Sequence, residues 1–252
     1  METTIGSGGL RLAAHISRPP GAAGPLPGLV LCHGFPAVPG CEAATVQTYS
    51  ELADHLATEG EWVVLTFNFR GTGGSEGDFS LSGWLDDLRA AVGHLGRSDG
   101  VAGVWVAGSS TGGALAICEA AEDERVRGVA TLAAPAGFAT WAADPEVFLT
   151  HAREVGVISD PGHPVDPERW ARELAEIDPL SVVAKIPPRP LLIVHGQDDE
   201  VVPLDAARAL AEGAGDSADL RVVPGAGHRL RHDPRVVAIL LGWLERMAIQ
   251  PE

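Results

Sequence analysis

Lysine is almost absent from this sequence of 252 residues, in which Lys185 is the only lysine among 18 basic residues. A single lysine leaves no candidate for the phosphate-binding lysine of a P-loop, and it disfavours a serine–lysine catalytic pair or a Schiff base. Basic residues as a group are also scarce, because 34 acidic residues give a formal net charge of −16. We therefore expect no nucleic-acid partner and no anionic membrane surface as a partner.

Long hydrophobic runs and paired cysteines are missing as well. No stretch approaches about 20 uninterrupted apolar residues, so no transmembrane span is expected. The first residues lack a basic head followed by an apolar run, so we expect no secretion signal. The odd set of Cys32, Cys41 and Cys118 has no paired spacing and is typical of a reduced, cytoplasmic protein. Cys32 and Cys118 are expected in the core, and Cys41 in a loop.

What the chain does have is a hydrophobic content of 45%, spread evenly along its length. That content excludes disorder and is enough for a core without disulfides or a metal. Short apolar runs alternate with segments of helical spacing. The expected strands are 10–17 (as an edge strand), 27–33, 62–69, 101–107, 126–133, 190–195 and 220–223, and the expected helices are 45–58, 81–95, 111–121, 206–212 and 236–247.

This alternation predicts an α/β fold with a mostly parallel, doubly wound sheet and helices on both faces. Active sites in such sheets lie beyond the carboxyl ends of the strands. More than fifty residues separate the strand that ends near Ala134 from the strand that begins at Leu191. Two helical patterns, 144–155 and 166–177, each open with an Asp-Pro pair suited to an N-cap. We therefore expect a single domain, 1–252, with a small helical cap inserted at about 136–185.

A nucleophile elbow is indicated where the strand VAGVWVA runs into Gly108-x-Ser110-x-Gly112 and then into a helix. A serine that projects above a sheet needs a tight strand-to-helix turn, and its neighbours must be nearly free of side chains. The helix that begins there points its free N–H groups at developing negative charge. The alternative interpretation of this motif is a plain glycine-rich turn.

A serine hydroxyl needs a base, and the base needs an orienting carboxylate. In this kind of fold the chain order is serine, acid, histidine. Asp198 and Asp199 follow the strand PLLIVH, and His228 ends the small-residue loop PGAGH after the last strand. Each position lies just past the carboxyl end of a strand, where the partners of Ser110 are expected.

Five segments in order carry a resemblance to a known family: HGF (33–35), FNFRGTGGSEG (67–77), GSSTG (108–112), HGQDDEVVP (195–203) and GAGH (225–228). Together they resemble α/β-hydrolases of the lidless or small-cap esterase type, similar to the serine-aminopeptidase-like and dienelactone-hydrolase-like branches. The resemblance covers nearly the whole chain. It implies Ser110 as nucleophile, His228 as base and Asp199 as acid, with Asp198 as the alternative acid.

The same resemblance implies an oxyanion hole made by the backbone N–H groups of Phe35 and Thr111. Pro36 has no N–H and cannot contribute. Relatives commonly carry aspartate where this chain has Asn68. This difference affects how the oxyanion loop is supported, and it leaves the expected reaction unchanged. Because the nucleophile is a serine, the resemblance implies acyl transfer without a cofactor. A carboxylesterase for small to medium acyl esters is the favoured function.

Several alternatives to a carboxylesterase stay open on the sequence. A peptidase, a thioesterase or an acyltransferase would use the same three residues, and a non-catalytic ligand-binding module would need none of them. The small-molecule substrate is expected to be an acyl ester, and the oligomeric state is not predicted. The neutral form of His228 is needed for the base role, so activity should fall on acidification.

Aromatic residues of the expected insertion are the candidates for binding substrate, namely Phe138, Trp141, Phe148 and Trp170. They would form a hydrophobic acyl or aryl pocket. The alternative is that these rings only pack the inserted helices onto the sheet.

Other chemistry is disfavoured. His232 follows His228 by four residues, but no third ligand is evident and Arg229 and Arg231 oppose a cation, so no metal is expected. The loop after Arg70 lacks the glycine spacing of a dinucleotide site. His33 and His195 each precede a glycine at a strand end, where we expect them to orient loops through hydrogen bonds.

Overall fold

The central sheet contains eight strands in the order β1-β2-β4-β3-β5-β6-β7-β8. The computed structural model describes residues 1–21, 24–38 and 42–249, and the loop expected at Cys41 lies outside these residues. From β4 to β8 all neighbours pair in parallel, whereas β1 and β2 are antiparallel additions at one edge. The strands are β1 (Glu2–Ser7), β2 (Leu10–Ser17), β3 (Leu26–Cys32), β4 (Val63–Phe67), β5 (Val101–Ser109), β6 (Val126–Leu132), β7 (Leu191–Gly196) and β8 (Ala218–Val223).

Helices follow the strands as the alternating pattern predicts. The α-helices are α1 (Glu42–Gly60), α2 (Leu81–Gly96), α3 (Thr111–Glu122), α4 (Ala139–Ala143), α5 (Pro145–Glu154), α6 (Pro167–Glu176), α7 (Pro179–Val182), α8 (Leu204–Ala214) and α9 (Pro234–Ile249). Short 3-10 turns are η1 (Val183–Lys185), η2 (Gly215–Ser217) and η3 (Leu230–His232). The predicted α/β fold with a mostly parallel sheet is therefore confirmed.

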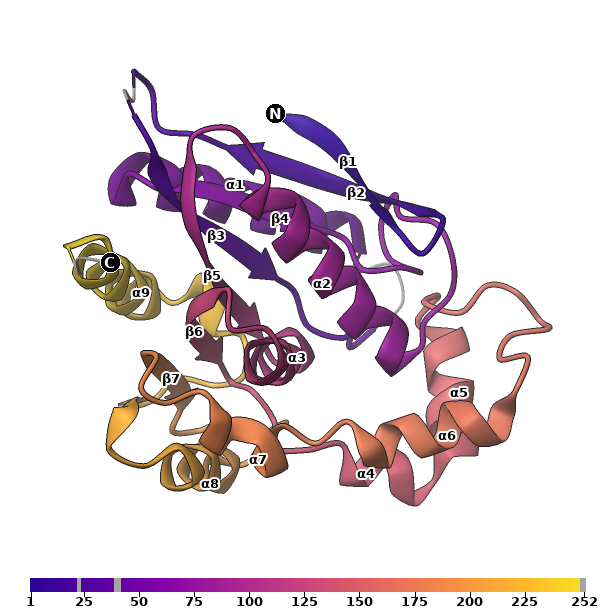
Figure 1. Cartoon of the computed structure of the whole chain (residues 1–252). Coiled ribbons are helices and arrows are strands. Elements are labelled where there is room, and N and C mark those ends of the chain that lie inside the picture. Colours follow the sequence, from indigo (N-terminus) through magenta and orange to yellow (C-terminus); the bar gives the residue numbers. More distant parts are fainter. Residues whose placement is uncertain (22–23, 39–41, 250–252) are drawn as a thin grey trace.

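Two hydrophobic layers hold the helices on the sheet (Figure 1). Side chains of α2, α3 and α8 pack on one face, where Trp84 and Leu115 are fully buried. Side chains of α1 and α9 pack on the other face, around Leu56 and Trp243. Strands such as β4, whose five residues are all buried, lie between the two layers. Burial on both faces explains why these strands are continuous apolar runs in the sequence.

One predicted edge strand lies inside the sheet. The segment 10–17 is β2, and β1 pairs with its outer side. In β1 only Ile5 and Ser7 are buried, and the remaining residues are polar or glycine. A strand that buries so few apolar side chains leaves no clear hydrophobic pattern, which is why the sequence did not reveal it.

Helices α4 to α7 occupy the long segment between β6 and β7, and α4, α5 and α6 lie together at one end of the molecule (Figure 1). The Asp-Pro pairs cap α5 and α6 as predicted. Asp144 accepts a hydrogen bond from the Val147 amide at 3.1 Å, and Asp166 accepts one from the Arg169 amide at 2.9 Å. Each proline stands in the first turn of its helix.

The turn at Ser110 is the most constrained part of the backbone that positions the site. Ser110 has φ 50° and ψ −123°, a conformation that side-chain-bearing residues rarely adopt. A Cβ at Gly112 would lie 2.3 Å from the His33 carbonyl oxygen, and a Cβ at Gly108 would lie 2.4 Å from the Gly112 oxygen. The glycines of the motif are therefore required by close approaches between backbones.

A buried acid lies behind this turn, on α3. Glu119 is fully buried, and the nearest guanidinium, that of Arg89 on α2, lies 3.3 Å away. Neither Glu119 oxygen makes a hydrogen bond. Burial raises the pKa of Glu119 to about 7, against the opposing effect of Arg89. The folded protein thus favours the protonated acid.

We expect Glu119→Gln to stabilise the protein more at pH 8 than at pH 4.5. A raised folded-state pKa contributes stability that is present below the unfolded pKa and is lost as pH rises through about 7. The gain in the free energy of unfolding on substitution should be larger at pH 8 than at pH 4.5 by up to about 3 kcal/mol. Urea titrations at both pH values measure this difference. The exposed Glu124→Gln is the control, and an equal gain at both pH values would contradict the assignment.

We expect Gly112→Ala to destabilise the fold by about 1–3 kcal/mol, because the new methyl group meets the His33 carbonyl. Thermal and urea unfolding measure the loss. The matched control is Gly242→Ala in α9, where a Cβ meets only the end of the Arg246 side chain at 3.9 Å. The control should stabilise the protein by about 0.5–1 kcal/mol. Similar effects of the two substitutions would show that the elbow tolerates a side chain.

Candidate active site

Three side chains from separate loops meet at the carboxyl ends of β5, β7 and β8. His228 Nε2 lies 3.2 Å from Ser110 Oγ, and His228 Nδ1 lies 2.9 Å from Asp199 Oδ2. A carboxylate accepts hydrogen bonds only, so the Nδ1–H of His228 donates to Asp199. This leaves Nε2 of the neutral ring as an acceptor for the Ser110 hydroxyl. The structure thus brings together the serine, the acid and the histidine that the sequence singled out.

Asp199 is fixed by its own loop. The Asp199 side chain is fully buried, and its Oδ1 accepts the amide N–H groups of Val201 and Val202, both at 2.9 Å. Asp198 is exposed, and its amide donates to the Ala226 carbonyl at 2.9 Å. Of the two acids that the sequence left as alternatives, the structure therefore places Asp199 against His228.

His195 supports the acid loop, as expected of a histidine that orients a loop. It is fully buried, and its Nε2–H donates to the Val202 carbonyl at 2.9 Å. The same nitrogen lies 3.5 Å from Asp199 Oδ2. A Cβ at the next residue, Gly196, would lie 2.3 Å from the Ala226 oxygen. The absence of this side chain lets the loop with the acid approach the loop that carries His228.

His33 ties the loop after β3 to the loop after β4. Its Nε2 accepts the Phe69 amide at 3.2 Å, so the proton lies on Nδ1, which donates to the Gly34 carbonyl at 2.8 Å. Burial lowers the pKa of His33 to about 4, and the positive charge of Arg231 adds to this effect. A ring that stays neutral at ordinary pH serves as a fixed link and not as a proton carrier.

The arginine of the loop after β4 is anchored by a buried carboxylate. Asp87 on α2 is fully buried and bonds the Arg70 guanidinium at 2.7 Å and the Arg70 amide at 2.8 Å. The Ser7 hydroxyl also donates to Asp87 at 2.7 Å. At the position where relatives carry aspartate, Asn68 is buried, and its backbone bonds to Ala13 and Ser75. This loop is held by groups other than the Asn68 side chain.

The two expected oxyanion donors flank the nucleophile. Thr111 is the first residue of α3, and Phe35 lies in the loop after β3. A Cβ at Gly34 would lie 2.8 Å from the Ser110 Cβ, which places this loop directly against the nucleophile. No oxygen of residues 1–21, 24–38 or 42–249 accepts a hydrogen bond from the Phe35 or Thr111 amide. Both N–H groups are therefore free for a ligand.

The four aromatic residues proposed to bind substrate pack on one another. Trp141 stacks on Phe148 with ring centroids 4.1 Å apart, and Phe148 stacks on Trp170 at 5.7 Å. Phe138 stacks on Trp141 at 5.1 Å. Phe138, Phe148 and Trp170 are each at most 5% exposed, and none of the four lines the cavity beside Ser110. These positions favour the packing alternative, because the rings bury one another against the body of the molecule.

The Phe35 side chain joins this aromatic cluster, a contact that the sequence analysis missed. Its ring lies 5.2 Å from Trp141, 5.3 Å from Phe148 and 5.1 Å from Phe79. The ring also lies 5.8 Å from Trp84 and thus packs between α2 and the inserted helices, while Phe35 is also one of the residues that line the cavity beside Ser110. No local pattern reveals such a contact, because the rings come from four separate segments of the chain.

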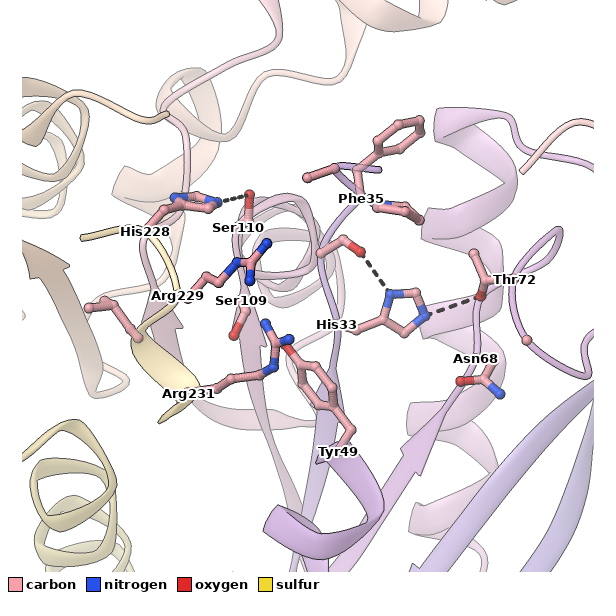
Figure 2. Close-up of a pocket in the computed structure, with 15 residues that line it drawn as sticks. His33, Phe35, Tyr49, Asn68, Thr72, Ser109, Ser110, His228, Arg229 and Arg231 are labelled. Carbon is pink, nitrogen blue, oxygen red and sulfur yellow. Dashed lines mark hydrogen bonds between the residues drawn. The ribbon is translucent and has the colours of Figure 1, made fainter. Parts of the chain in front are cut away.

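A cavity of about 90 Å³ adjoins the nucleophile (Figure 2). Four of its lining residues were singled out from the sequence for individual roles, namely His33, Phe35, Ser110 and His228. It did not predict that the polar residues Tyr49, Thr72, Ser109, Arg229 and Arg231 would line the cavity, and Asn68 lines it as well. Tyr49 comes from α1, 60 residues before Ser109 and 180 residues before Arg229, so only the fold could bring it there.

Neither a metal centre nor a membrane span is found in the described part of the chain. No group of three or more histidine, cysteine, aspartate or glutamate side chains there could hold a metal ion. Among the described residues, no helix combines the length and the apolar character needed to cross a bilayer.

Comparison with known proteins identifies similar chains. A monoacylglycerol lipase from Mycolicibacterium smegmatis is 26% identical, with 93% of this chain and 92% of that protein covered. The structure of Est1E from Butyrivibrio proteoclasticus has a TM-score of 0.71 at 22% identity and covers 98% of this chain and 96% of its own. The esterase domain of a Rhodothermus marinus protein has a TM-score of 0.67 at 25% identity, covering 98% and 97% of the two chains.

The family itself is settled by a match that spans most of the chain. The sequence pattern described as the alpha/beta hydrolase family matches residues 29–239. This region runs from β3, which leads to Phe35, into the closing helix α9, and it includes Ser110, Asp199 and His228. With its eight-stranded sheet and its serine at the elbow between β5 and α3, the chain belongs to the alpha/beta hydrolase family.

Proposed function

We propose that this chain is a serine hydrolase that cleaves carboxylic esters of small to medium acyl groups. The observation that carries the proposal is the placement of His228 between Ser110 Oγ, at 3.2 Å, and the buried Asp199 carboxylate, at 2.9 Å. A histidine held in this way can take a proton from the serine hydroxyl and later return it. A module that only binds a ligand would need none of the three groups.

Acylation begins with attack of Ser110 Oγ on the ester carbonyl carbon. His228 Nε2 takes the hydroxyl proton, and Asp199 stabilises the resulting imidazolium without itself becoming protonated. The tetrahedral intermediate carries its negative charge on the former carbonyl oxygen, where the amides of Phe35 and Thr111 donate hydrogen bonds. The C–O bond to the leaving group then breaks, and His228 gives its proton to the departing alcohol.

Deacylation repeats these steps with water as the nucleophile. His228 removes a proton from the water as its oxygen attacks the acyl carbon, and the same two amides stabilise the second tetrahedral intermediate. Collapse of that intermediate breaks the bond to Ser110 Oγ. His228 returns the proton to Ser110, and the carboxylic acid leaves.

Ester hydrolysis is favoured over other acyl transfers by the relatives. The mycobacterial protein bears the name of a monoacylglycerol lipase, and the similar Rhodothermus marinus structure is named an esterase domain. Thioesters, anilides and peptides would need the same three residues. Parallel assays of ester, thioester, anilide and peptide substrates distinguish these activities, and higher kcat/KM for the ester is the expected result.

We expect a fluorophosphonate probe to label Ser110 covalently. The probe reports an activated serine, because an unassisted hydroxyl is a poor nucleophile. Mass mapping of the adduct identifies the site. Labelling should be absent in Ser110→Ala and should slow by at least about 100-fold in His228→Ala. Well-folded wild-type protein that stays unlabelled would argue for a non-catalytic binding module.

We expect Asp199→Asn to lower kcat for an ester substrate by about 10³–10⁴-fold, because an amide in place of the carboxylate favours the wrong tautomer of His228. The matched control is Asp198→Asn, which removes the same charge from the exposed neighbouring side chain and should keep kcat within about 3-fold of the wild type. Steady-state kinetics measure both variants. A larger loss in the Asp198 variant than in the Asp199 variant would reverse the assignment.

A further inference from the structure

Two arginines without acidic partners face the cavity beside the nucleophile. Arg229 and Arg231 line it together with Ser110, and both side chains extend from the loop that carries His228 toward the side formed by Ser109 and Tyr49 (Figure 2). Within the described residues, neither guanidinium meets a carboxylate. Elsewhere in this acidic chain, arginines that face the interior do pair with buried carboxylates, as Arg70 does with Asp87 and Arg89 with Glu119.

Buried polar atoms without hydrogen-bond partners converge on the same cavity. They are the Tyr49 hydroxyl, the Ser109 hydroxyl and Nε of Arg231. A buried donor left unpaired costs about 1–3 kcal/mol, so such groups are rare in folded proteins. The Tyr49 and Ser109 hydroxyls lie close enough for a hydrogen bond from Ser109 to lower the pKa of Tyr49, so one hydroxyl proton and the Arg231 Nε–H still lack an acceptor, which a ligand can supply.

All three groups can act as donors. Burial raises the pKa of Tyr49, despite the opposing effects of Arg231 and Ser109, so its hydroxyl stays protonated. The Arg231 guanidinium lies over the Tyr49 ring at 5.4 Å, a cation–π contact that helps to hold it in place. The hydroxyls of Tyr49 and Ser109 and the guanidinium of Arg231 together suit an anion with several acceptor oxygens.

We propose that this cavity binds a carboxylate of the substrate, so that the preferred substrates are esters that carry a free carboxylate, such as monoesters of short dicarboxylic acids. The inference rests on the proposed esterase function and names its substrate class. A planar carboxylate matches the guanidinium fork, and the hydroxyls of Tyr49 and Ser109 can complete its coordination. The cavity of about 90 Å³ suits a short carboxylate-bearing group.

The charge of the whole molecule gives the two arginines a second effect. A net charge of −16 repels anionic substrates and slows their approach. Arg229 is exposed, whereas Arg231 is partly buried. The exposed cation attracts the anion to the opening, and the partly buried one holds it beside Ser110.

The test compares two 4-nitrophenyl esters of equal length, 4-nitrophenyl hydrogen glutarate and its neutral methyl ester. Release of nitrophenolate gives kcat/KM for each after subtraction of the rate in buffer. The wild type should prefer the anionic ester by at least about 10-fold. Arg231→Gln and Arg229→Gln should each reduce this ratio by about 5-fold or more. The control Arg172→Gln removes an exposed charge from α6, outside the cavity, and should leave the ratio unchanged.

The outcomes separate the two proposals. Hydrolysis of both esters with no preference for the anion overturns the carboxylate site and leaves the esterase function standing. A preference that survives both arginine substitutions also overturns the site. Failure to hydrolyse either ester, together with no fluorophosphonate labelling, overturns the esterase function.

A binding measurement tests the site without catalysis. Isothermal titration of Ser110→Ala with glutarate should show binding that weakens at least about 5-fold when Arg231→Gln is added. Absence of glutarate binding overturns the proposal. Stronger binding of inorganic phosphate than of glutarate would overturn the assignment of a carboxylate.

Discussion

The candidate site depends on close contact between backbones at the carboxyl edge of the sheet. Three loops approach one another so closely there that a single methyl group at Gly112, Gly34 or Gly196 would collide with a neighbour at 2.3 to 2.8 Å. These contacts press the loop after β3 against Ser110 and draw the acid loop toward the loop of His228. The three side chains that hydrogen-bond at this edge, Ser110, Asp199 and His228, stand on these packed loops.

The three histidines at this edge differ in their burial and in the groups that they bond. His33 and His195 are almost fully enclosed and use their ring nitrogens to link loops. His228 keeps 23% of its side chain exposed and bridges the serine and the acid. The enclosed rings link loops, and the more accessible ring lies between the serine and the acid.

Much of this arrangement could be predicted from the sequence because the relevant signals are local. The alternation of apolar runs and helical spacing indicated the layered fold, and GSSTG (108–112) placed the elbow. Pairing of Asp199 with His228 rested on a resemblance, since composition alone could not choose between two adjacent acids. β1 was missed because it buries only two side chains.

Features built from distant segments could not be predicted in the same way. Tyr49 and Arg231 are far apart in the chain, and only the fold places them in one cavity. In the sequence, Arg231 indicates only that a cation beside His228 and His232 is disfavoured. Likewise, Phe35 was chosen for its amide, whereas its ring contacts with Trp141 and Phe148 depend on how the inserted helices return to the sheet.

The Phe35 ring joins the loop after β3 to the helices between β6 and β7. Its loop lies against Ser110, and its ring packs between Trp84 of α2 and the helices that follow β6. Phe35 is the proposed oxyanion donor of the loop after β3, so a rearrangement of those helices would displace its backbone together with its ring. Engineering of the helices between β6 and β7 would therefore have to preserve the packing of this one ring.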